Sequence, residues 1–347
     1  MPTSNNIESS DNINKVVLLV GGAGYIGLVI AKQLASKGMH VIILDNMIYD
    51  HHLGLHSIFY NPNIKYLNHD IRNDLPKDFV DKNNITDVVI LAGLVGDPIT
   101  KKYPDLSSKI NNIAIQKLIN CLNNCGLSKL IFISTCSNYG LIKEGAKADE
   151  NFALTPLSLY AKDKVANEEY LQENSDSFDF SYSILRFATA FGVAPRMRFD
   201  LSVNEFVYEA FTTKNLEIYD ADTWRPYCHV IDFANLIELV INSSIEITDK
   251  EIFNAGGDTN NHTKRDLVEM IANHIPDLNI KYVDGGIDPR NYIVDFSKVE
   301  NILKFKPSVS VNQGIKEIIE YLEKGIFLDY RNNKNFYGNY LIEEQDN

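Results

Sequence analysis

The sequence contains no lysine- or arginine-rich run, and its 46 acidic residues outnumber its 33 lysines and arginines. The formal net charge is −13, whereas a protein that follows nucleic-acid phosphates or an anionic membrane surface needs a basic face. We therefore expect neither nucleic acid nor a membrane as a partner. An anionic ligand would have to be held by a few placed arginines and by backbone amides.

Long apolar runs are also missing, since none approaches the roughly 20 residues that span a bilayer. Residues 1–14 are polar, rich in Asn and Ser, and lack the apolar region of a secretory signal. The sequence therefore predicts a cytoplasmic protein in which residues 1–14 form a disordered tail.

Cysteine is scarce, with four in 347 residues. Cys121 and Cys125 are four residues apart in an expected helix, a spacing that a metal pair could use. No histidine or acidic pair accompanies them, and the eight histidines show no zinc spacing. We therefore expect buried packing thiols and no metal site.

The first half of the chain alternates apolar runs with helical periods. Near-continuous apolar runs are typical of parallel strands buried on both faces, and they predict strands at 15–20, 40–44, 64–67, 88–92, 130–134 and 181–187. Helical periods lie between them, at 25–37, 105–124 and 157–172. This alternation predicts an α/β fold built on a doubly wound parallel sheet of the Rossmann type.

Beyond residue 187 the pattern is less regular. It indicates helices at 203–212, 229–242, 263–274 and 313–324, strands at 216–219, 252–255 and 280–283, and a loop at 220–227. We expect residues 15–187 to form a dinucleotide-binding domain to which residues 228–257 return. Residues 188–227 and 258–328 would form a smaller, interleaved substrate lobe, and residues 329–347 a polar tail.

A glycine-rich segment, Gly21–Gly27, follows the first expected strand and opens the first helix. Glycines permit a tight turn and let the backbone approach a pyrophosphate, which the N–H groups at a helix N-terminus can bind. Asp45 lies at the end of the second strand, about 20 residues further on, where an acid accepts the hydroxyl protons of a ribose and repels a 2′-phosphate. This context predicts NAD rather than NADP as the cofactor.

Tyr160 and Lys164 are four residues apart on one face of an expected helix. A tyrosine with its reference pKa of about 10 is a poor base, but a nearby ammonium favours the phenolate and lowers that pKa. Thr135 ends an expected strand, where open α/β sheets place their ligands. Its hydroxyl could hydrogen-bond an oxygen of a bound ligand.

These motifs together resemble the extended short-chain dehydrogenases/reductases, the NAD-dependent epimerase/dehydratase group that acts on nucleotide sugars. The resemblance runs from about residue 16 to residue 322. It rests on Gly21–Gly27, Asp45 and Asn46, residues 69–72, 91–93, Asn111, residues 134–140, Tyr160 and Lys164, Arg186, residues 224–230 and residues 288–290.

The resemblance implies catalytic roles for Thr135, Tyr160 and Lys164. Lys164 would also bond the nicotinamide ribose. Implied cofactor-binding residues are Gly21, Gly24, Tyr25, Ile26, Gly27, Asp45, Asn46, Asp70, Ile71, Leu91, Ala92, Gly93, Asn111, Tyr160 and Lys164. Arg225 and Arg290 match arginines that bind the substrate diphosphate in this family, and Arg196 and Asn204 are further candidates for substrate binding.

The residues after Thr135 distinguish between the reactions of the family. Relatives that are 4,6-dehydratases carry Asp-Glu there, whereas this chain has Cys136 and Ser137. The 3,5-epimerising relatives place a cysteine one residue later, so Cys136 is out of register. The expected reaction is therefore hydride transfer at C4, as a 4-epimerase or 4-dehydrogenase.

Several alternatives stay open at this point. Reduction of a 4-keto sugar uses the same three catalytic residues, and a 4,6-dehydratase or a non-catalytic NAD-binding sensor is less favoured. The resemblance also implies a homodimer that packs through the helices at 105–124 and 157–172. A modified sugar for surface polysaccharide is one substrate that would suit the chain.

Overall fold

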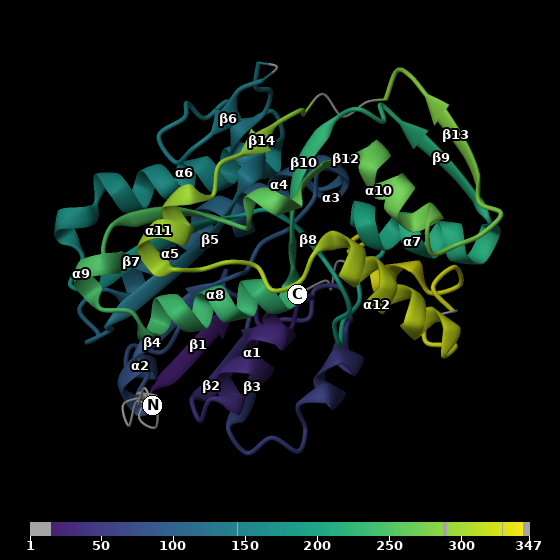
Figure 1. Cartoon of the computed structure of the whole chain (residues 1–347). Coiled ribbons are helices and arrows are strands. Elements are labelled where there is room, and N and C mark those ends of the chain that lie inside the picture. The colour runs from purple at the N-terminus through teal and green to yellow at the C-terminus, as the bar shows by residue number, and fades with distance from the viewer. Residues whose placement is uncertain (1–14, 144, 287–289, 328, 343–347) are drawn as a thin grey trace, which may run out of the picture.

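The computed structural model describes residues 15–143, 145–286, 290–327 and 329–342 (Figure 1). The expected disordered tail at residues 1–14, and positions 288 and 289 of the family resemblance, lie outside the described residues.

A seven-stranded parallel sheet forms the centre of the molecule, with the order β11-β7-β5-β4-β1-β2-β3. Its strands are β1 (Val16–Val20), β2 (His40–Asp45), β3 (Ile64–Asn68), β4 (Asp87–Ile90), β5 (Lys129–Thr135), β7 (Ser181–Phe187) and β11 (Glu251–Ala255). The strand order reverses direction between β1 and β4, which is where doubly wound sheets bind their ligands. The predicted α/β fold is confirmed.

Helices cover both faces of this sheet, and the alternating side chains of β1 show why. Val17 and Leu19 are buried in one core with the helices α1 (Gly27–Ser36) and α8 (Val230–Asn242), which pack against each other. Leu18 and Val20 point the other way, into a second core with α5 (Ile115–Leu122) and α6 (Leu159–Glu173). Figure 1 shows α1 and α8 side by side in front of the sheet.

The segment expected as one helix at 105–124 is divided in the structure. It consists of α4 (Pro104–Ser107), a π-helical stretch from Ser108 to Ala114, and α5. The side chain of Asn111 explains a departure from regular α-helix, because it bonds the backbone of Leu94 instead of facing water. The remaining helices of this half are short: α2 (Phe79–Lys82) and α3 (Asp97–Lys102).

The smaller lobe contains two further sheets and three helices. The first sheet has the order β12-β10-β8, and the second pairs β13 with β9. These elements are β8 (Thr189–Phe191), β9 (Asn215–Tyr219), β10 (Trp224–His229), β12 (Asn261–Thr263), β13 (Asn279–Val283), α7 (Ser202–Thr213), α10 (Lys264–Ala272) and α12 (Val311–Glu323). Short elements β6 (Lys147–Ala148), β14 (Ile293–Val294), α9 (Ile245–Thr248) and α11 (Ser297–Leu303) complete the chain.

Two expectations for the second half are wrong. The second half of the loop expected at 220–227 is part of strand β10, which pairs with β8 and β12 although Pro226 lies within it. The described part of the expected polar tail packs against the protein: Tyr330 and Ile342 are buried in two different cores. The segment is polar in composition, but its aromatic side chains provide the apolar surface that packs against the lobe.

No helix in the part of the chain that the structure describes is long and apolar enough to cross a membrane. Among the same residues, no group of three or more His, Cys, Asp or Glu side chains could hold a metal ion. The expected burial of Cys121 and Cys125 is wrong for Cys121, which is exposed beyond the packed face of α5, while Cys125 is partly buried.

Candidate active site

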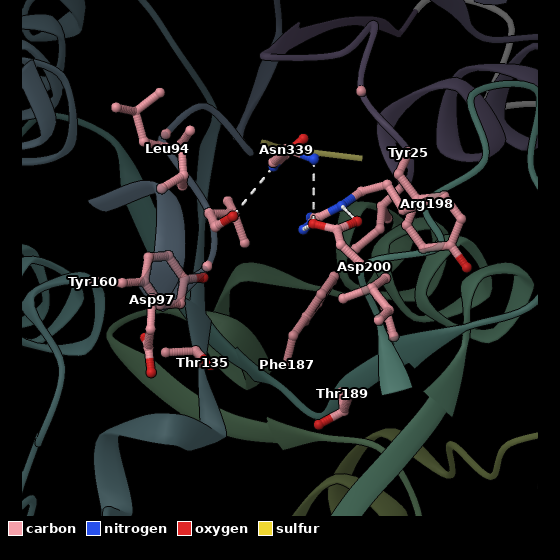
Figure 2. Close-up of a pocket in the computed structure, with 18 of the residues that line it drawn as sticks. Tyr25, Leu94, Asp97, Thr135, Tyr160, Phe187, Thr189, Arg198, Asp200 and Asn339 are labelled. Atoms are coloured by element: carbon pink, nitrogen blue, oxygen red, sulfur yellow. Dashed lines mark hydrogen bonds and ion pairs between the residues drawn. The ribbon is translucent and has the colours of Figure 1, made fainter. Parts of the chain in front are cut away.

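The strand ends of the sheet open onto a cavity of about 840 Å³, whose other wall comes from the smaller lobe (Figure 2). The expected site residues line this cavity with two exceptions, Asn111 and Asn204. Residues that are distant in the sequence thus meet in one place. The lining extends from the glycine turn, past the strand ends, to the smaller lobe.

The glycine turn cannot accept larger residues. Gly21 has φ +78°, and a Cβ there would lie 2.6 Å from the backbone of Ala92. A Cβ at Gly27 would lie 2.5 Å from the carbonyl oxygen of Gly22. The helix α1 then begins without a side-chain cap, and its first backbone hydrogen bond runs from the Leu28 amide to Gly24. The Gly27 amide just before it is placed to bind an anion at the cavity wall.

Asp45 is fixed by the backbone beside this turn. Its carboxylate accepts hydrogen bonds from the amides of Ala23 at 3.0 Å and Met47 at 2.9 Å. Burial raises the pKa of Asp45, and these two amide bonds oppose that rise. Asn46 donates to Asp70 at 2.9 Å, so the two strand-end loops after β2 and β3 are joined at this end of the cavity.

Thr135 and Tyr160 lie together on the wall formed by β5 and α6. Thr135 is the last residue of β5, and its hydroxyl accepts a bond from the amide of Ser137 at 3.1 Å. Tyr160 is the second residue of α6, whose N-cap is Ser158. Burial raises the pKa of Tyr160 above its usual value, while the charge of Arg198 and the Thr135 hydroxyl lower it.

Lys164 lies near Tyr160, with its ammonium 5.9 Å from the centre of the Tyr160 ring. Its ammonium donates to the carbonyl oxygen of Ile133 at 2.6 Å and lies 4.7 Å from the centre of the Phe132 ring. Burial lowers the pKa of Lys164 to about 8, against the opposing charges of Glu168 and Asp163. Arg198, on the opposite wall, is a second cation, and its charge lowers the pKa of Tyr160.

Arg225 and Arg290 lie together at the end of the cavity nearest Ser137. A side-chain nitrogen of Arg225 donates to the carbonyl oxygen of Arg290 at 2.5 Å, and its guanidinium lies 5.1 Å from the centre of the Tyr292 ring. Arg290 contacts Ser137 and forms an ion pair of 3.4 Å with Asp97. This cluster is a positively charged wall next to Thr135, suited to an anionic group.

Arg196 lies apart from that cluster. Its guanidinium lies 5.1 Å from the centre of the Tyr49 ring and donates to Asn339 at 2.9 Å. The positive charge of Arg196 also lowers the pKa of Asp45. Arg196 therefore lies on the Asp45 side of the cavity rather than beside Arg225. The neighbouring Arg198 forms a bidentate ion pair with Asp200, at 2.9 and 2.6 Å, and faces Tyr160 across the cavity (Figure 2).

Asn111 and Asn204 are buried behind the wall. Asn111 accepts from the amide of Leu94 at 2.7 Å and donates to its carbonyl oxygen, and so fixes the loop after β4. Asn204 accepts from the amide of Gly192 and donates to the hydroxyl of Tyr25 at 3.0 Å. Their side chains therefore support residues of the cavity, and direct contact with a ligand is not supported by this geometry.

A family model described as "NAD dependent epimerase/dehydratase family" matches residues 17–256. The chain belongs to the NAD-dependent epimerase/dehydratase family. Its members that resemble it include the UDP-glucuronate 4-epimerase of Thermodesulfobacterium geofontis, 26% identical over 90% of this chain and 97% of the relative. The UDP-glucose 4-epimerase of Lacticaseibacillus casei is 26% identical over 88% of this chain and 94% of the relative.

Solved structures of this family share the fold. The UDP-glucuronic acid 4-epimerase of Bacillus cereus, in complex with UDP-glucuronic acid and NAD, has a TM-score of 0.79 at 22% identity, covering 89% of this chain and 99% of that one. The dTDP-glucose 4,6-dehydratase of Bacillus anthracis, in complex with NAD, has a TM-score of 0.78 at 24% identity, covering 89% and 97%. One epimerase structure and one dehydratase structure thus share the fold of this chain.

Residues of the cavity that were not identified from the sequence include Asp97 and Asn339. Nothing in the sequence pattern indicated that Asp97 and Arg198 lie near Tyr160. Asn339 stands in the segment expected as a tail. The sequence carried a signal for none of these contacts, because each joins parts of the chain that are distant in sequence.

Proposed function

We propose that this protein is an NAD-dependent enzyme that oxidises a nucleotide-diphosphate sugar at C4, as a 4-epimerase or a 4-dehydrogenase. The observation that carries the proposal is the position of Thr135 and Tyr160 on one wall of a cavity that also contains the glycine turn and Asp45. Proton transfer and cofactor binding are thereby possible within one enclosed site.

The residues of the cavity fit NAD. The space above Gly21 and Gly27 is already taken by backbone atoms, so only glycine gives the turn that offers the α1 amides to a pyrophosphate. Asp45, fixed by two backbone amides, is an acceptor for the ribose hydroxyls. Bound NAD would supply the acceptor for the hydride that leaves C4.

The protein's own residues would handle the proton. Tyr160 takes the proton from the C4 hydroxyl of the sugar, and Thr135 orients that oxygen by hydrogen bonding. Lys164, held under the strand end by Ile133, would bond the cofactor ribose, and Arg225 and Arg290 would hold the diphosphate. Return of the hydride to the opposite face of C4 gives the epimer, and release of the ketone gives the dehydrogenase product.

The two residues after Thr135 disfavour dehydration. Cys136 is buried away from the cavity, its thiol donates to the carbonyl oxygen of Arg186 at 3.1 Å, and burial raises its pKa. Ser137 lines the cavity but is neither an acid nor a base at neutral pH. The position that would have to donate or accept a proton across C5 and C6 therefore has no suitable group.

A panel of sugar nucleotides with uridine, thymidine, guanosine and cytidine diphosphate tests the proposal. The NAD-loaded protein is incubated with each, and the product is identified by NMR and by mass. A 4-epimer or a 4-ketone is the expected product, whereas loss of one water would indicate a dehydratase. The Tyr160→Phe variant should bind NAD normally and lose about 100- to 10,000-fold in turnover. Unchanged turnover in that variant would contradict a catalytic role for Tyr160.

A further inference from the structure

Asp97 is the first residue of α3 and lines the cavity next to the two reacting side chains. Figure 2 shows its carboxylate beside Tyr160 and Thr135, on the wall opposite Arg198. The negative charge of Asp97 is close enough to Tyr160 to raise the pKa of that phenol. No role for this acid was expected from the sequence.

A chain of polar contacts connects Asp97 to Thr135. One oxygen of Asp97 pairs with a terminal nitrogen of Arg290 at 3.4 Å. The other terminal nitrogen of Arg290 donates to the hydroxyl of Ser137 at 3.4 Å, and the amide of Ser137 donates to Thr135 at 3.1 Å. Asp97 is therefore part of the frame around the place where a sugar hydroxyl would meet Thr135 and Tyr160.

The second oxygen of Asp97, Oδ1, is buried and has no hydrogen-bond partner among the described residues. The Asp97 side chain as a whole is 23% exposed and lines the cavity, so a ligand that brings a hydrogen-bond donor to this wall can reach the carboxylate and gain a strong, charge-assisted bond. Hydroxyl and ammonium groups of a sugar are such donors. A carboxylate is not.

We propose that Asp97 selects the sugar of the substrate, favouring one that presents hydroxyl or amine donors and excluding a uronate. This inference rests on the proposed function, because it assumes that a nucleotide sugar reacts at Thr135 and Tyr160. It narrows the substrate to neutral or amino sugars.

The charges at this end of the cavity support the same conclusion. Arg225 and Arg290 give two positive charges, and Asp97 cancels one of them. One positive charge of the two arginines then remains uncompensated. The two negative charges of a substrate diphosphate already exceed it. A sugar carboxylate beside Asp97 would add a repulsion between like charges a few ångströms apart, worth about 10- to 1,000-fold in affinity.

Equilibrium binding to the NAD-loaded protein tests this. The nucleoside diphosphate that binds most tightly is first chosen among the uridine, thymidine, guanosine and cytidine forms. Its glucose and glucuronate conjugates, which differ only at C6, are then compared by calorimetry or by the fluorescence of Trp224, the single tryptophan of the chain. The wild-type protein should bind the glucose conjugate at least about tenfold more tightly.

The Asp97→Asn variant should reduce this preference to about threefold or less, mainly by tighter binding of the glucuronate conjugate. Asp105→Asn removes one charge from an exposed position on the neighbouring α4 and should keep the wild-type preference. Equal binding of the two conjugates by the wild-type protein, or an unchanged preference in Asp97→Asn, overturns the role of Asp97 and leaves the proposed function standing. If no nucleoside diphosphate or conjugate binds, both fail.

A second variant keeps the proposal testable if Asp97→Asn does not fold. NAD retention and the thermal midpoint of the variant show whether the fold is intact, and Asp97→Ser provides a second neutral side chain at the same position. A preference for the glucose conjugate that persists in both folded variants overturns the proposal. Loss of the preference in both supports it.

Discussion

The ammonium of Lys164 donates a hydrogen bond to the carbonyl oxygen of Ile133 at 2.6 Å and lies 5.9 Å from the centre of the Tyr160 ring. The same side chain is 2% exposed, and burial lowers its pKa to about 8 from the usual 10.5. A lysine whose pKa is lower in the folded than in the unfolded chain destabilises the fold most below the folded pKa. This cost declines as pH rises from about 8 to 10.5, because in that range the folded state has already lost the proton that the unfolded state still holds.

The pH dependence of stability should therefore change when Lys164 is replaced. Between pH 7 and pH 9.5, the free energy of unfolding of the wild-type protein should rise by about 2 kcal/mol relative to Lys164→Met. Denaturant titrations of both proteins at the two pH values measure this difference, and all other ionisable groups cancel. An identical pH response of the two proteins would contradict the buried, low-pKa state of Lys164.

Arg198 should control the pH at which the enzyme becomes active. Its positive charge lowers the pKa of Tyr160, against the larger rise caused by burial. Since the phenolate form takes the substrate proton, activity should increase with pH, and Arg198→Gln should move that increase to higher pH. The profile of kcat/KM against pH measures the shift.

Arg196→Gln is a suitable control for this experiment, because it removes the same charge from the same cavity but on the Asp45 side. We expect it to leave the pH profile in place, even if cofactor binding weakens. A profile that moves equally in both variants would show a general effect of charge rather than a local effect of Arg198 on Tyr160.

The hydrogen bonds of Asn339 should slow the release of bound NAD. Its side chain accepts from Arg196 at 2.9 Å and donates to the carbonyl oxygen of Val95 at 3.2 Å, and its amide donates to Asp200 at 3.3 Å. It therefore connects the loop after β4 to the loop before α7 across the cavity (Figure 2). Loss of two side-chain hydrogen bonds, at about 1 kcal/mol each, predicts roughly thirtyfold faster release of NAD from Asn339→Ala.

Exchange of bound NAD against isotopically labelled NAD gives this rate. Asn332→Ala alters an exposed asparagine of the same C-terminal segment and should release NAD at the wild-type rate. If the Asn339→Ala variant exchanges NAD no faster than the Asn332→Ala variant, the C-terminal segment packs on the hydrophobic core but does not retain NAD in the cavity.

Glu168 should be important for stability. It is 1% exposed and accepts hydrogen bonds from Arg186, Ser134 and Asn138 beneath the end of β5. Glu168→Ala leaves a buried guanidinium without its partner and should lower the free energy of unfolding by about 3–5 kcal/mol. The exposed neighbour Glu169 provides the control, since Glu169→Ala should change stability by less than about 0.5 kcal/mol. Equal effects of the two substitutions in denaturant titrations would contradict this role.

The sequence was informative wherever a local rule applies. The apolar runs predicted all seven strands of the parallel sheet, because a strand buried on both faces needs apolar residues at successive positions. It was less informative where tertiary contacts override local preference. Strand β10 was expected to be a loop, and the helix at 105–124 contains a π-helical stretch that Asn111 stabilises through Leu94. The C-terminal segment was misjudged because its aromatic residues find their partners only in the folded lobe.

By itself the sequence determined the family, the glycine turn, the acid after β2 and the residues Thr135 and Tyr160. Each of these follows from a short motif whose spacing is fixed by backbone geometry. Only the tertiary structure decided the electrostatic partners of the site: Arg198 faces Tyr160, Lys164 bonds Ile133, and Asp97 pairs with Arg290. Such pairs depend on which strand ends and loops meet across the cavity, and that arrangement is set by packing of the whole chain rather than by any local pattern.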